Sequence, residues 1–312
     1  MKSYAFGIDL GGTTVKIGLF DPQGTILEKW EIPTDKSNNG ANVLSDIAAS
    51  VLGKMKEKGI GADQVEGVGI DVPGPVLNET VVNRCVNIGW GVIDVGKELS
   101  EKLGGLTVKV GNDANVAALG EMWKGGGQGH QNVVMATLGT GVGGGIILNG
   151  KIVPGTFGAA GEIGHMCMNP NETAVCGCGK KGHLEQYASA TGITRMANDY
   201  LASYTGESSL KNIADPSAKD IFDAAKAGDQ AALDLVDKLG DMLGRAFALI
   251  SCVVDPEVYV IGGGVSKAGQ ILIDVTEKYF KKYAFHASEN AKITLATLGN
   301  DAGIYGAVRQ VL

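Results

Sequence analysis

The segment GIDLGGTTVKIGLF, at residues 7–20, is the part of the sequence that indicates the fold most clearly. An apolar run, a tight glycine-containing turn and a second apolar run predict two strands joined by a short turn. A related segment, MATLGTGVGGGIIL, lies at residues 135–148. The two segments align without gaps at a shift of 128 residues, which places Thr137 where the first copy has Asp9. The repeat therefore predicts a core that is built twice.

Each turn also has the chemistry of a phosphate-binding site. Glycines allow the backbone to turn sharply and to bring its amides close to an anion. In the first turn, the amides of Gly11 and Gly12 and the Thr13 hydroxyl can donate to phosphate oxygens. Lys16 adds positive charge, and Asp9 can hold hydrated Mg²⁺. The pattern is not the Walker type, because no helix follows the turn. A tight hairpin without a ligand is the alternative, but the second copy favours two lobes that grip one polyphosphate, as in an ATP-dependent phosphotransferase.

Composition narrows the class of protein. With 312 residues the chain can form two domains or one large one, and its 44% hydrophobic and 20% charged residues are typical of a soluble globular protein. The 48 glycines are about twice the usual share and gather at predicted turns. A net charge of −7 argues against nucleic acid as the main partner. The sequence shows neither a signal-peptide pattern nor an apolar stretch of about 20 residues, so we expect a cytoplasmic protein that does not bind a membrane.

Strand and helix patterns alternate along the chain, which predicts an α/β protein. A polar loop is expected after the segment PGP at 73–75, and residues 155–187 are expected to be irregular. The expected strands are 4–10, 15–20, 25–32, 65–71, 106–111, 132–138, 143–148, 151–153, 258–261 and 293–298. The expected helices are 41–58, 92–103, 114–124, 189–203, 217–227, 229–252, 267–282 and 302–311.

The two turns, Asn112-Asp113 and the three glycines at 262–264 together resemble the superfamily of sugar kinases, actin and heat-shock ATPases. More narrowly, nearly the whole chain, from about residue 4 to residue 310, resembles the ROK family and, within it, bacterial ATP-dependent glucokinases. The resemblance implies a two-lobed, actin-like or hexokinase-type α/β fold with a duplicated β-meander and an active-site cleft between the lobes. We expect a small lobe at 1–112, with the last helix at about 300–312 packed on it, and a large lobe at 113–299.

Asp113 is the expected general base. A sugar hydroxyl has a pKa far above neutrality, so its attack on the γ-phosphate of ATP benefits from a carboxylate that accepts its proton. Asn112 beside it can orient the same sugar through hydrogen bonds. Asp113 also stands where a helix is expected to begin, so a helix N-cap is the alternative role, and the two roles are compatible.

The resemblance implies a set of further sugar contacts. Glu162 and His165 lie in the segment GEIGH, and Glu185 lies in HLEQ. Carboxylates suit a polyol because each accepts hydrogen bonds from neighbouring hydroxyls and fixes the ring before transfer. Solvated surface charges are the alternative for both glutamates. Gly74 is expected to contact the sugar through its backbone, and Asn87 is a further candidate.

The segment CGCGKKGH, from Cys176 to His183, resembles the family's structural zinc loop, here 165–183. In most members we expect a third cysteine where this chain has His183. His165, Cys176, Cys178 and His183 still make a Cys₂His₂ set, which suits tetrahedral Zn²⁺. Four protein ligands leave no open position, so zinc would organise the sugar pocket, with one ring nitrogen of His165 on zinc and the other facing the sugar. A metal-free loop of reduced thiols is the alternative.

The nucleotide is expected to contact a third glycine-rich turn as well. Gly263 and Gly264 follow an apolar strand and precede a helix, and they resemble the family's adenosine motif, in which purine and ribose lie against the backbone. The second phosphate turn would contribute Thr140, Gly141 and Gly143.

Together these features predict an enzyme that transfers the γ-phosphoryl group of MgATP to the 6-hydroxyl of glucose. The same contacts serve fructose, mannose, allose and N-acylhexosamines such as N-acetylmannosamine, so another such sugar is the nearest alternative. A sugar-responsive repressor is disfavoured, because the phosphate turn begins at Asp9 and leaves no room before it for a DNA-binding domain. A non-catalytic sugar-binding protein is disfavoured by Asp9, Thr13 and Asp113. Sugar and ATP are the expected partners, and the resemblance implies a homodimer or homotetramer.

Overall fold

The computed structural model describes residues 2–312, which form two compact units. The first contains the chain up to Gly129 together with Gly145–Gly161 and Thr297–Leu312, and the second contains His130–Gly144 and Glu162–Ala296. Among the described residues, no helix is both long and apolar enough to cross a membrane. The lobe boundaries expected from the sequence, 1–112 and 113–299, stay a prediction.

A five-stranded sheet forms the centre of the first unit. Its strands are β1 (Tyr4–Leu10), β2 (Thr14–Phe20), β3 (Ile26–Pro33), β4 (Val65–Val72) and β8 (Val108–Asn112). They lie in the order β3-β2-β1-β4-β8. β1 pairs antiparallel with β2 and parallel with β4, and β4 pairs parallel with β8. The five strands expected in this part of the chain are confirmed, with ends that differ by at most two residues.

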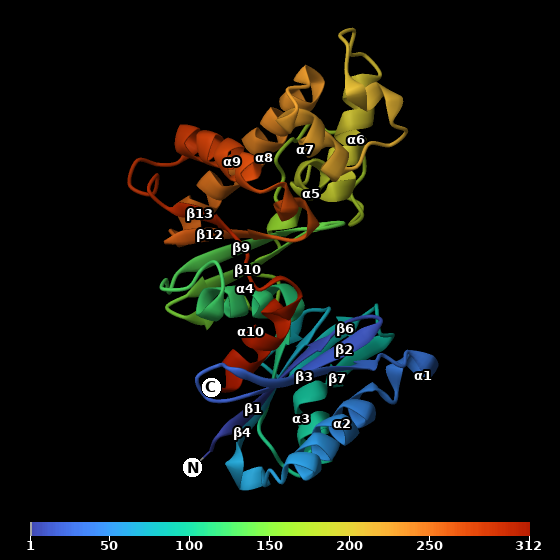
Figure 1. Ribbon diagram of the computed structural model, residues 1–312, viewed down its shortest axis with the longest axis vertical. Coiled ribbons are helices and arrows are strands. Elements are labelled where there is room, and N and C mark those ends of the chain that lie inside the picture. The colour runs from blue at the N-terminus through green and yellow to red at the C-terminus, as the bar shows by residue number, and fades with distance from the viewer. Residues whose placement is uncertain (1) are drawn as a thin grey trace. The chain divides into compact units, whose positions relative to one another are not determined.

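Helices cover both faces of this sheet. α2 (Val43–Lys58) and α3 (Val95–Lys102) share a hydrophobic core with β1 and β4, in which Phe6 and Ile70 are fully buried. Gly7 and Gly69 point to the opposite face, where α10 (Ala302–Val311) packs beside α4 (Asp113–Lys124) (Figure 1). A Cβ atom at Gly7 would lie 2.1 Å from the Ile304 carbonyl oxygen, and one at Gly69 would lie 1.7 Å from that of Ala307. Glycine is required at both positions for α10 to lie against the sheet.

Residues 76–94 differ from the expected polar loop and from the helix expected at 92–103. They form a small antiparallel sheet of β5 (Val76–Leu77), β6 (Val81–Cys85) and β7 (Trp90–Asp94). α3 begins only at Val95, because the Asp94 carboxylate caps it by accepting a hydrogen bond from the Lys97 amide at 3.0 Å. The prediction of helix over 92–94 was therefore wrong. The short helix α1 (Ser37–Gly40) before α2 was also not expected.

A second five-stranded sheet repeats the topology of the first. Its strands are β9 (Val133–Leu138), β10 (Val142–Leu148), β11 (Lys151–Ile152), β12 (Val258–Gly262) and β13 (Lys292–Leu295). Their order is β11-β10-β9-β12-β13, and β12 pairs parallel with both β9 and β13. A hairpin meander followed by two parallel strands thus occurs twice, as the repeated segments predicted.

The strand expected at 293–298 ends at Leu295, and a buried carboxylate explains why. Glu121 of α4 is 0% exposed and accepts hydrogen bonds from the amides of Gly126, Thr297 and Leu298 at 2.8, 3.0 and 2.9 Å. These amides bond to a side chain, so the chain after Leu295 no longer extends the sheet. Nothing in the local sequence near residue 297 signals this partner.

The helices of the second unit follow the sequence expectation closely, except that the short helix α5 (Glu185–Ala188) begins in a segment expected to be irregular. The others are α6 (Ala190–Leu201), α7 (Ala218–Lys226), α8 (Gln230–Val254) and α9 (Gln270–Tyr283). α9 begins three residues later than expected, because Gly264–Ala268 forms a separate 3₁₀ turn. The buried Tyr259 hydroxyl of β12 donates to the Phe247 carbonyl at 2.7 Å and lies 2.8 Å from Ser251 Oγ, which fixes α8 against this strand (Figure 1).

Candidate functional site

The first glycine-threonine turn follows β1 directly and is open on its outer side. The Gly11 amide donates to the Thr14 carbonyl at 3.0 Å and closes the turn. A Cβ atom at Gly11 would lie 2.9 Å from the Thr14 carbonyl oxygen, whereas one at Gly12 would meet nothing within 4 Å. Thr13 is exposed. The backbone at Gly12 and the Thr13 hydroxyl are therefore accessible to an anion.

Asp9 and Lys16 stand opposite each other on β1 and β2 and form an ion pair, with Nζ 2.8 Å from Oδ2. Burial opposes the charge on Lys16, but the hydrogen bond and the charge of Asp9 outweigh it and raise the pKa of Lys16. The ammonium also donates to the Asn300 carbonyl at 3.4 Å. The turn thus ends beside a cation and a carboxylate, the two charges that a MgATP phosphate site uses.

Asp71 is an acidic residue of this region that sequence reasoning missed. It pairs with Asp9 in the parallel register of β1 and β4, and it is only 1% exposed. Neither carboxylate oxygen has a hydrogen-bond partner among residues 2–312. Burial, and then the negative charges of Asp9 and Asp113, raise the pKa of Asp71 well above its ordinary value. An acid inside the apolar run of residues 65–72 was the signal that could have identified it.

Asn112, Asp113 and Gly74 meet where β8 passes into α4. Asn112 Oδ1 accepts from the amides of Ala114 and Asn115 at 3.1 and 3.2 Å, so Asn112 is the N-cap and the cap role considered for Asp113 is wrong. Asn112 Nδ2 donates to the Gly74 carbonyl at 3.3 Å and to Asp113 Oδ1 at 2.9 Å. The Asp113 side chain is exposed, which leaves its carboxylate accessible to a substrate.

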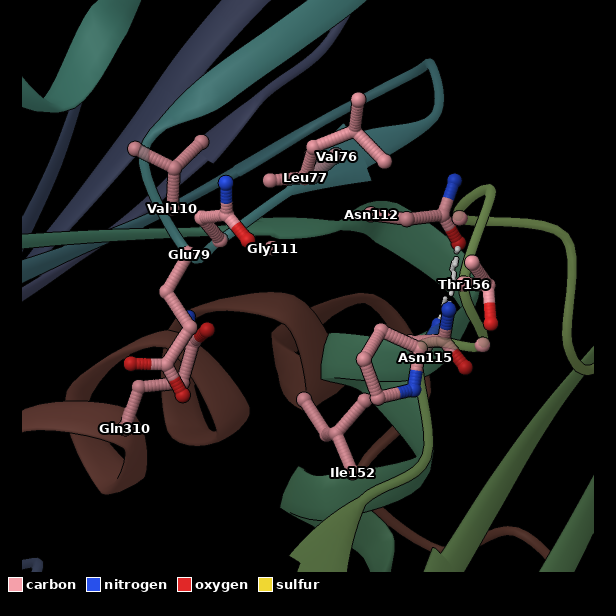
Figure 2. A pocket seen from close by; sticks show the side chains of 14 residues that line it. Val76, Leu77, Glu79, Val110, Gly111, Asn112, Asn115, Ile152, Thr156 and Gln310 are labelled. Carbon is pink, nitrogen blue, oxygen red and sulfur yellow. Dashed lines mark hydrogen bonds between the residues drawn. The ribbon is translucent and has the colours of Figure 1, made fainter.

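A cavity of about 180 Å³ lies next to Asn112 in the first unit. β5, β8, α4 and the loop after β11 line it, and Figure 2 shows Asn112 and Asn115 side by side at its wall, joined by hydrogen bonds. Asn115 Oδ1 has no hydrogen-bond partner within the described residues, and neither has Gln310 Nε2 in the same lining. The sequence analysis did not predict this cavity, because its walls come from four separate stretches of the chain.

The second glycine-threonine turn is held from outside by the start of α5 and α6. Glu185 Oε2 accepts from the Val142 amide at 3.0 Å. The Ala190 amide donates to the Gly139 carbonyl at 2.8 Å, and Thr191 Oγ1 donates to the Thr140 carbonyl at 2.7 Å.

Only glycine fits at position 141 of this turn, since a Cβ atom there would lie 2.2 Å from Glu185 Oε2. Thr140, Gly141 and Gly143 therefore belong to a turn whose shape is fixed before any ligand binds.

The three side chains expected to grip a sugar lie within the second unit. Glu162 and His165 are both exposed, and Glu162 Oε2 lies 3.9 Å from His165 Nε2. Glu185 differs from them, because one of its oxygens is bound by the Val142 amide and the other lies 3.5 Å from Cys176 Sγ. The Glu185 carboxylate thus connects the second phosphate turn with the cysteine-rich loop, a link that the sequence did not reveal.

The four candidate metal ligands come together. One donor atom each from His165, Cys176, Cys178 and His183 can be chosen so that all lie within 4.8 Å of one another. Cys178 Sγ lies 3.3 Å from His183 Nδ1. In a tetrahedral zinc site with bonds of about 2.0–2.3 Å, neighbouring ligand atoms are about 3.3–3.8 Å apart, so small shifts would complete the geometry.

The protonation chemistry of this cluster also suits a metal. Burial, and then the charge of His165, lower the pKa of His183, which favours the neutral imidazole that a metal binds. Burial raises the pKa of Cys176, so a bound cation would be needed to hold that thiol as a thiolate. The residues present therefore fit Zn²⁺.

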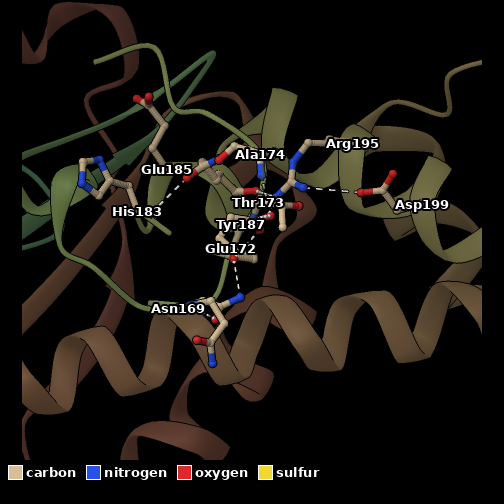
Figure 3. A network of polar contacts seen from close by, with 12 residues as sticks. Asn169, Glu172, Thr173, Ala174, His183, Glu185, Tyr187, Arg195 and Asp199 are labelled. Carbon is tan, nitrogen blue, oxygen red and sulfur yellow. Dashed lines mark hydrogen bonds and ion pairs between the residues drawn. The ribbon is translucent and has the colours of Figure 1, made fainter. Parts of the chain in front are cut away.

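A polar network supports the loop that carries the cysteines. Figure 3 shows Glu172, Tyr187 and Arg195 at its centre. Glu172 Oε2 accepts from the Tyr187 hydroxyl at 2.5 Å and lies 3.2 Å from Arg195 Nη2, while Oε1 accepts from the amides of Thr173 and Ala174. The hydrogen bond from Tyr187 is the largest of the effects that lower the pKa of Glu172 to about 2.

We expect Glu172→Gln to lower the free energy of unfolding by about 2 kcal/mol at pH 7. The full pKa shift corresponds to about 3 kcal/mol, and solvent at the 12% exposed edge reduces it. The folded-state pKa is depressed, so this stabilisation is complete above about pH 4.5 and is lost as the pH falls towards about 2. Urea unfolding at pH 7 and pH 3 should show a gap between wild type and variant that narrows at pH 3. The exposed Glu207→Gln serves as control, and a gap that does not change with pH would contradict the assignment.

The third glycine turn borders a second cavity, of about 190 Å³. Gly263 has a φ of 82°, and a Cβ atom there would lie 2.5 Å from the Leu138 carbonyl oxygen, so glycine is required. Gly264 lines the cavity together with an apolar floor of Phe222 and Val265. Three lysines also line it, namely Lys219, Lys226 and Lys267. The sequence predicted the glycines but not the contribution of α7.

Comparison with known proteins agrees with this arrangement. The model of the ROK family matches residues 5–312. A glucokinase from Halalkalibacterium halodurans is 44% identical over 96% of this chain and 92% of its own. An N-acetylgalactosamine kinase from a Shewanella species is 32% identical over 97% of this chain and 94% of its own.

A solved structure also supports membership of this family. The ROK family glucokinase from Streptomyces griseus in complex with glucose and AMPPNP has a TM-score of 0.72 and 34% identity, and the match covers 98% of each chain. Its likeness extends over both units, so the actin-like, hexokinase-type fold expected from the two phosphate turns is confirmed. The chain belongs to the ROK family.

Proposed function

We propose that this protein transfers the γ-phosphoryl group of MgATP to the 6-hydroxyl of glucose. The observation that carries the proposal is the exposed Asp113 carboxylate at the start of α4, beside the Asn112 amide and the Gly74 carbonyl. The glucokinase relatives, one of them in complex with glucose and AMPPNP, support both substrates.

Asp113 acts as the general base. Its carboxylate accepts the proton of the sugar hydroxyl as the oxygen attacks the γ-phosphate. Asn112 holds this carboxylate through Nδ2, at 2.9 Å from Asp113 Oδ1, and the same amide faces the Gly74 carbonyl. Asn112 thus positions Asp113, which takes the proton, and a hydrogen bond from Asn112 to the sugar would replace its bond to Gly74 or to Asp113. Asn87, in the same unit, is a weaker candidate for a sugar contact.

The phosphates of ATP bind the two glycine-threonine turns. Gly12 and Thr13 are accessible on the first, whereas the amide of Gly11 closes the turn, and Lys16 supplies a cation at its edge. Asp9 would hold Mg²⁺, which would neutralise the charge that develops on the leaving group. The adenosine lies against Gly263 and Gly264, with the apolar floor of Phe222 and Val265 beside it. The remaining contacts to phosphate come from Thr140, Gly141 and Gly143.

Glu162, His165 and Glu185 are the further side chains that orient the sugar. His165, Cys176, Cys178 and His183 would hold Zn²⁺, which would fix the loop that carries these groups and would take no part in the transfer, because four protein ligands leave no open position. Glu185 Oε2 accepts from the Val142 amide and Oε1 lies 3.5 Å from Cys176 Sγ, so a sugar hydroxyl bound by Glu185 would share an oxygen with one of these groups.

We place the protein in the cytoplasm, with sugar and ATP as its small-molecule partners and a homodimer or homotetramer as its assembly. Kinases for N-acylhexosamines are the second candidate, since an N-acetylgalactosamine kinase is 32% identical over nearly the whole chain. A sugar-sensing role without catalysis would require that Asp113 does not act as a general base.

ADP release from MgATP should be measured against glucose, mannose, fructose, allose, N-acetylglucosamine and N-acetylmannosamine, with phosphate located on C6 of the product. We expect the highest kcat/KM for glucose, because a glucokinase is 44% identical to this chain and an N-acetylgalactosamine kinase only 32%. A higher kcat/KM for an N-acylhexosamine would show that this sugar, and not glucose, is the preferred substrate, while the proposed mechanism of transfer would stand. ATP binding without turnover on any sugar would contradict the proposed function.

A further inference from the structure

Asp71 is a buried carboxylate that interacts with another carboxylate, Asp9, and whose oxygens accept no hydrogen bond from the described residues. It is 1% exposed, both oxygens lack a hydrogen-bond partner within residues 2–312, and it is the one aspartate among the buried polar residues of this part of the chain. Buried carboxylates normally accept hydrogen bonds or face a cation, because an uncompensated charge is strongly unfavourable away from water. Its environment is therefore incomplete without a partner from outside the protein.

The neighbouring charges define what that partner is. Asp9 adjoins Asp71 in register on β1, and Asp113 contributes further negative charge. Among the described residues that act on Asp71, the carboxylates of Asp9 and Asp113 outnumber the single ammonium of Lys16, which bonds to Asp9 Oδ2. The surroundings of Asp71 are therefore negative and favour a cation.

Helix α10 packs directly against this pair of carboxylates. Gly303, in its first turn, has no side chain, and a Cβ atom there would lie 2.7 Å from Asp71 Oδ2 and 3.1 Å from Asp9 Cγ. Even an alanine would thus press on both acids at once. The glycine keeps side-chain atoms away from the face that the two carboxylates share.

We propose that Asp71 is a second carboxylate of the magnesium site, which it forms together with Asp9. This inference rests on the proposed function, in which Asp9 alone was assigned to the metal. Oxygen ligands from carboxylates are what Mg²⁺ and Mn²⁺ prefer, and a pair of them binds a cation more tightly than one. Asp71 would supply a ligand oxygen beside those of Asp9, its in-register neighbour on β1.

The test is a titration of the nucleotide-free protein with Mn²⁺, followed by the electron paramagnetic resonance signal of free Mn²⁺. Asp71→Asn and Asp9→Asn are each expected to weaken Mn²⁺ binding at least tenfold. Asp46→Asn, an exposed aspartate of α2, is the matched control and should bind as the wild type does. Gly303→Ala removes no acid but places a methyl group 2.7 Å from Asp71 Oδ2 and 3.1 Å from Asp9 Cγ, which must displace the two carboxylates, so it too should weaken binding by several-fold. It also carries the test if Asp71→Asn fails to fold, which thermal melting would reveal.

Three outcomes would overturn the inference. If Asp71→Asn binds Mn²⁺ as tightly as the wild type while Asp9→Asn does not, Asp71 has no part in the site and the assignment of Asp9 stands. If both variants bind normally, the proposed magnesium site itself is wrong. If the wild-type protein binds no Mn²⁺, both the inference about Asp71 and the assignment of Asp9 to the metal are wrong.

Discussion

Replacing Asp113 by asparagine is expected to lower kcat by about 10²- to 10⁴-fold, the loss typical of removing a general base. An amide has nearly the shape of a carboxylate, but at neutral pH it does not accept the proton of the sugar hydroxyl. The variant can keep the hydrogen bond from the Ala114 amide, which in the wild type lies 2.8 Å from Asp113 Oδ1, so α4 should begin unchanged. Steady-state ADP release with saturating MgATP and a range of glucose concentrations measures the effect.

The split between kcat and KM separates the base from a positioning role. Glucose is held mainly by Asn112, Glu162 and His165 in the proposed mechanism, so the KM of the Asp113→Asn variant should change much less than its kcat. Asp113→Ala should lose at least as much turnover, and Asp46→Asn should lose none. Near-normal kcat in a folded Asp113→Asn protein would mean that the residue only occupies the first turn of α4.

The hairpins could be predicted from sequence because their signal is local. In the segments at 7–20 and 135–148, apolar runs flank glycines, and those residues alone specify strand, turn and strand. Residues 76–94 carry no such signal, since β5 has only two residues and the chain passes through left-handed backbone at Asn78, Glu79 and Arg84. Short strands of this kind depend on pairing partners that are not adjacent in sequence.

The candidate site likewise contains features that have a local sequence signal and features that have none. The four metal donors could be proposed from their spacing and a family resemblance, and the structure brings them together. The bond between Glu185 and the Val142 amide spans 43 positions, and that between Glu121 and the Leu298 amide spans 177, so neither has a local signature. Asp71 had a weak signal, an acid within an apolar strand, whose meaning depends on Asp9 lying beside it in the next strand.

Replacing Cys176 and Cys178 together by serine is expected to abolish zinc retention and to lower Tm by roughly 10 °C. Ligand that binds only the native state stabilises by RT ln(1 + [L]/Kd), which is about 4 kcal/mol when free zinc is 1,000 times Kd. In a chain of this size 1 kcal/mol corresponds to about 2–4 °C. Elemental analysis and thermal melting measure the two quantities, and a strong chelator should move the wild type towards the variant. Cys252→Ser, an exposed cysteine of α8, is the control.

Substitutions at position 183 test directly whether His183 is a zinc ligand. His183→Cys offers a thiolate where the histidine now lies 3.3 Å from Cys178 Sγ, and the resulting Cys₃His set should keep one zinc per chain. His183→Ala leaves three ligands and should lose most of the metal, with a fall in Tm between those of wild type and the double serine variant. Because Glu185 joins Cys176 to the Val142 amide of the second phosphate turn, metal loss should also raise the KM for ATP. Full zinc content in the double serine variant would show that the metal is bound elsewhere, and an unchanged Tm after zinc removal would show that the loop holds its shape through the Glu172 network alone.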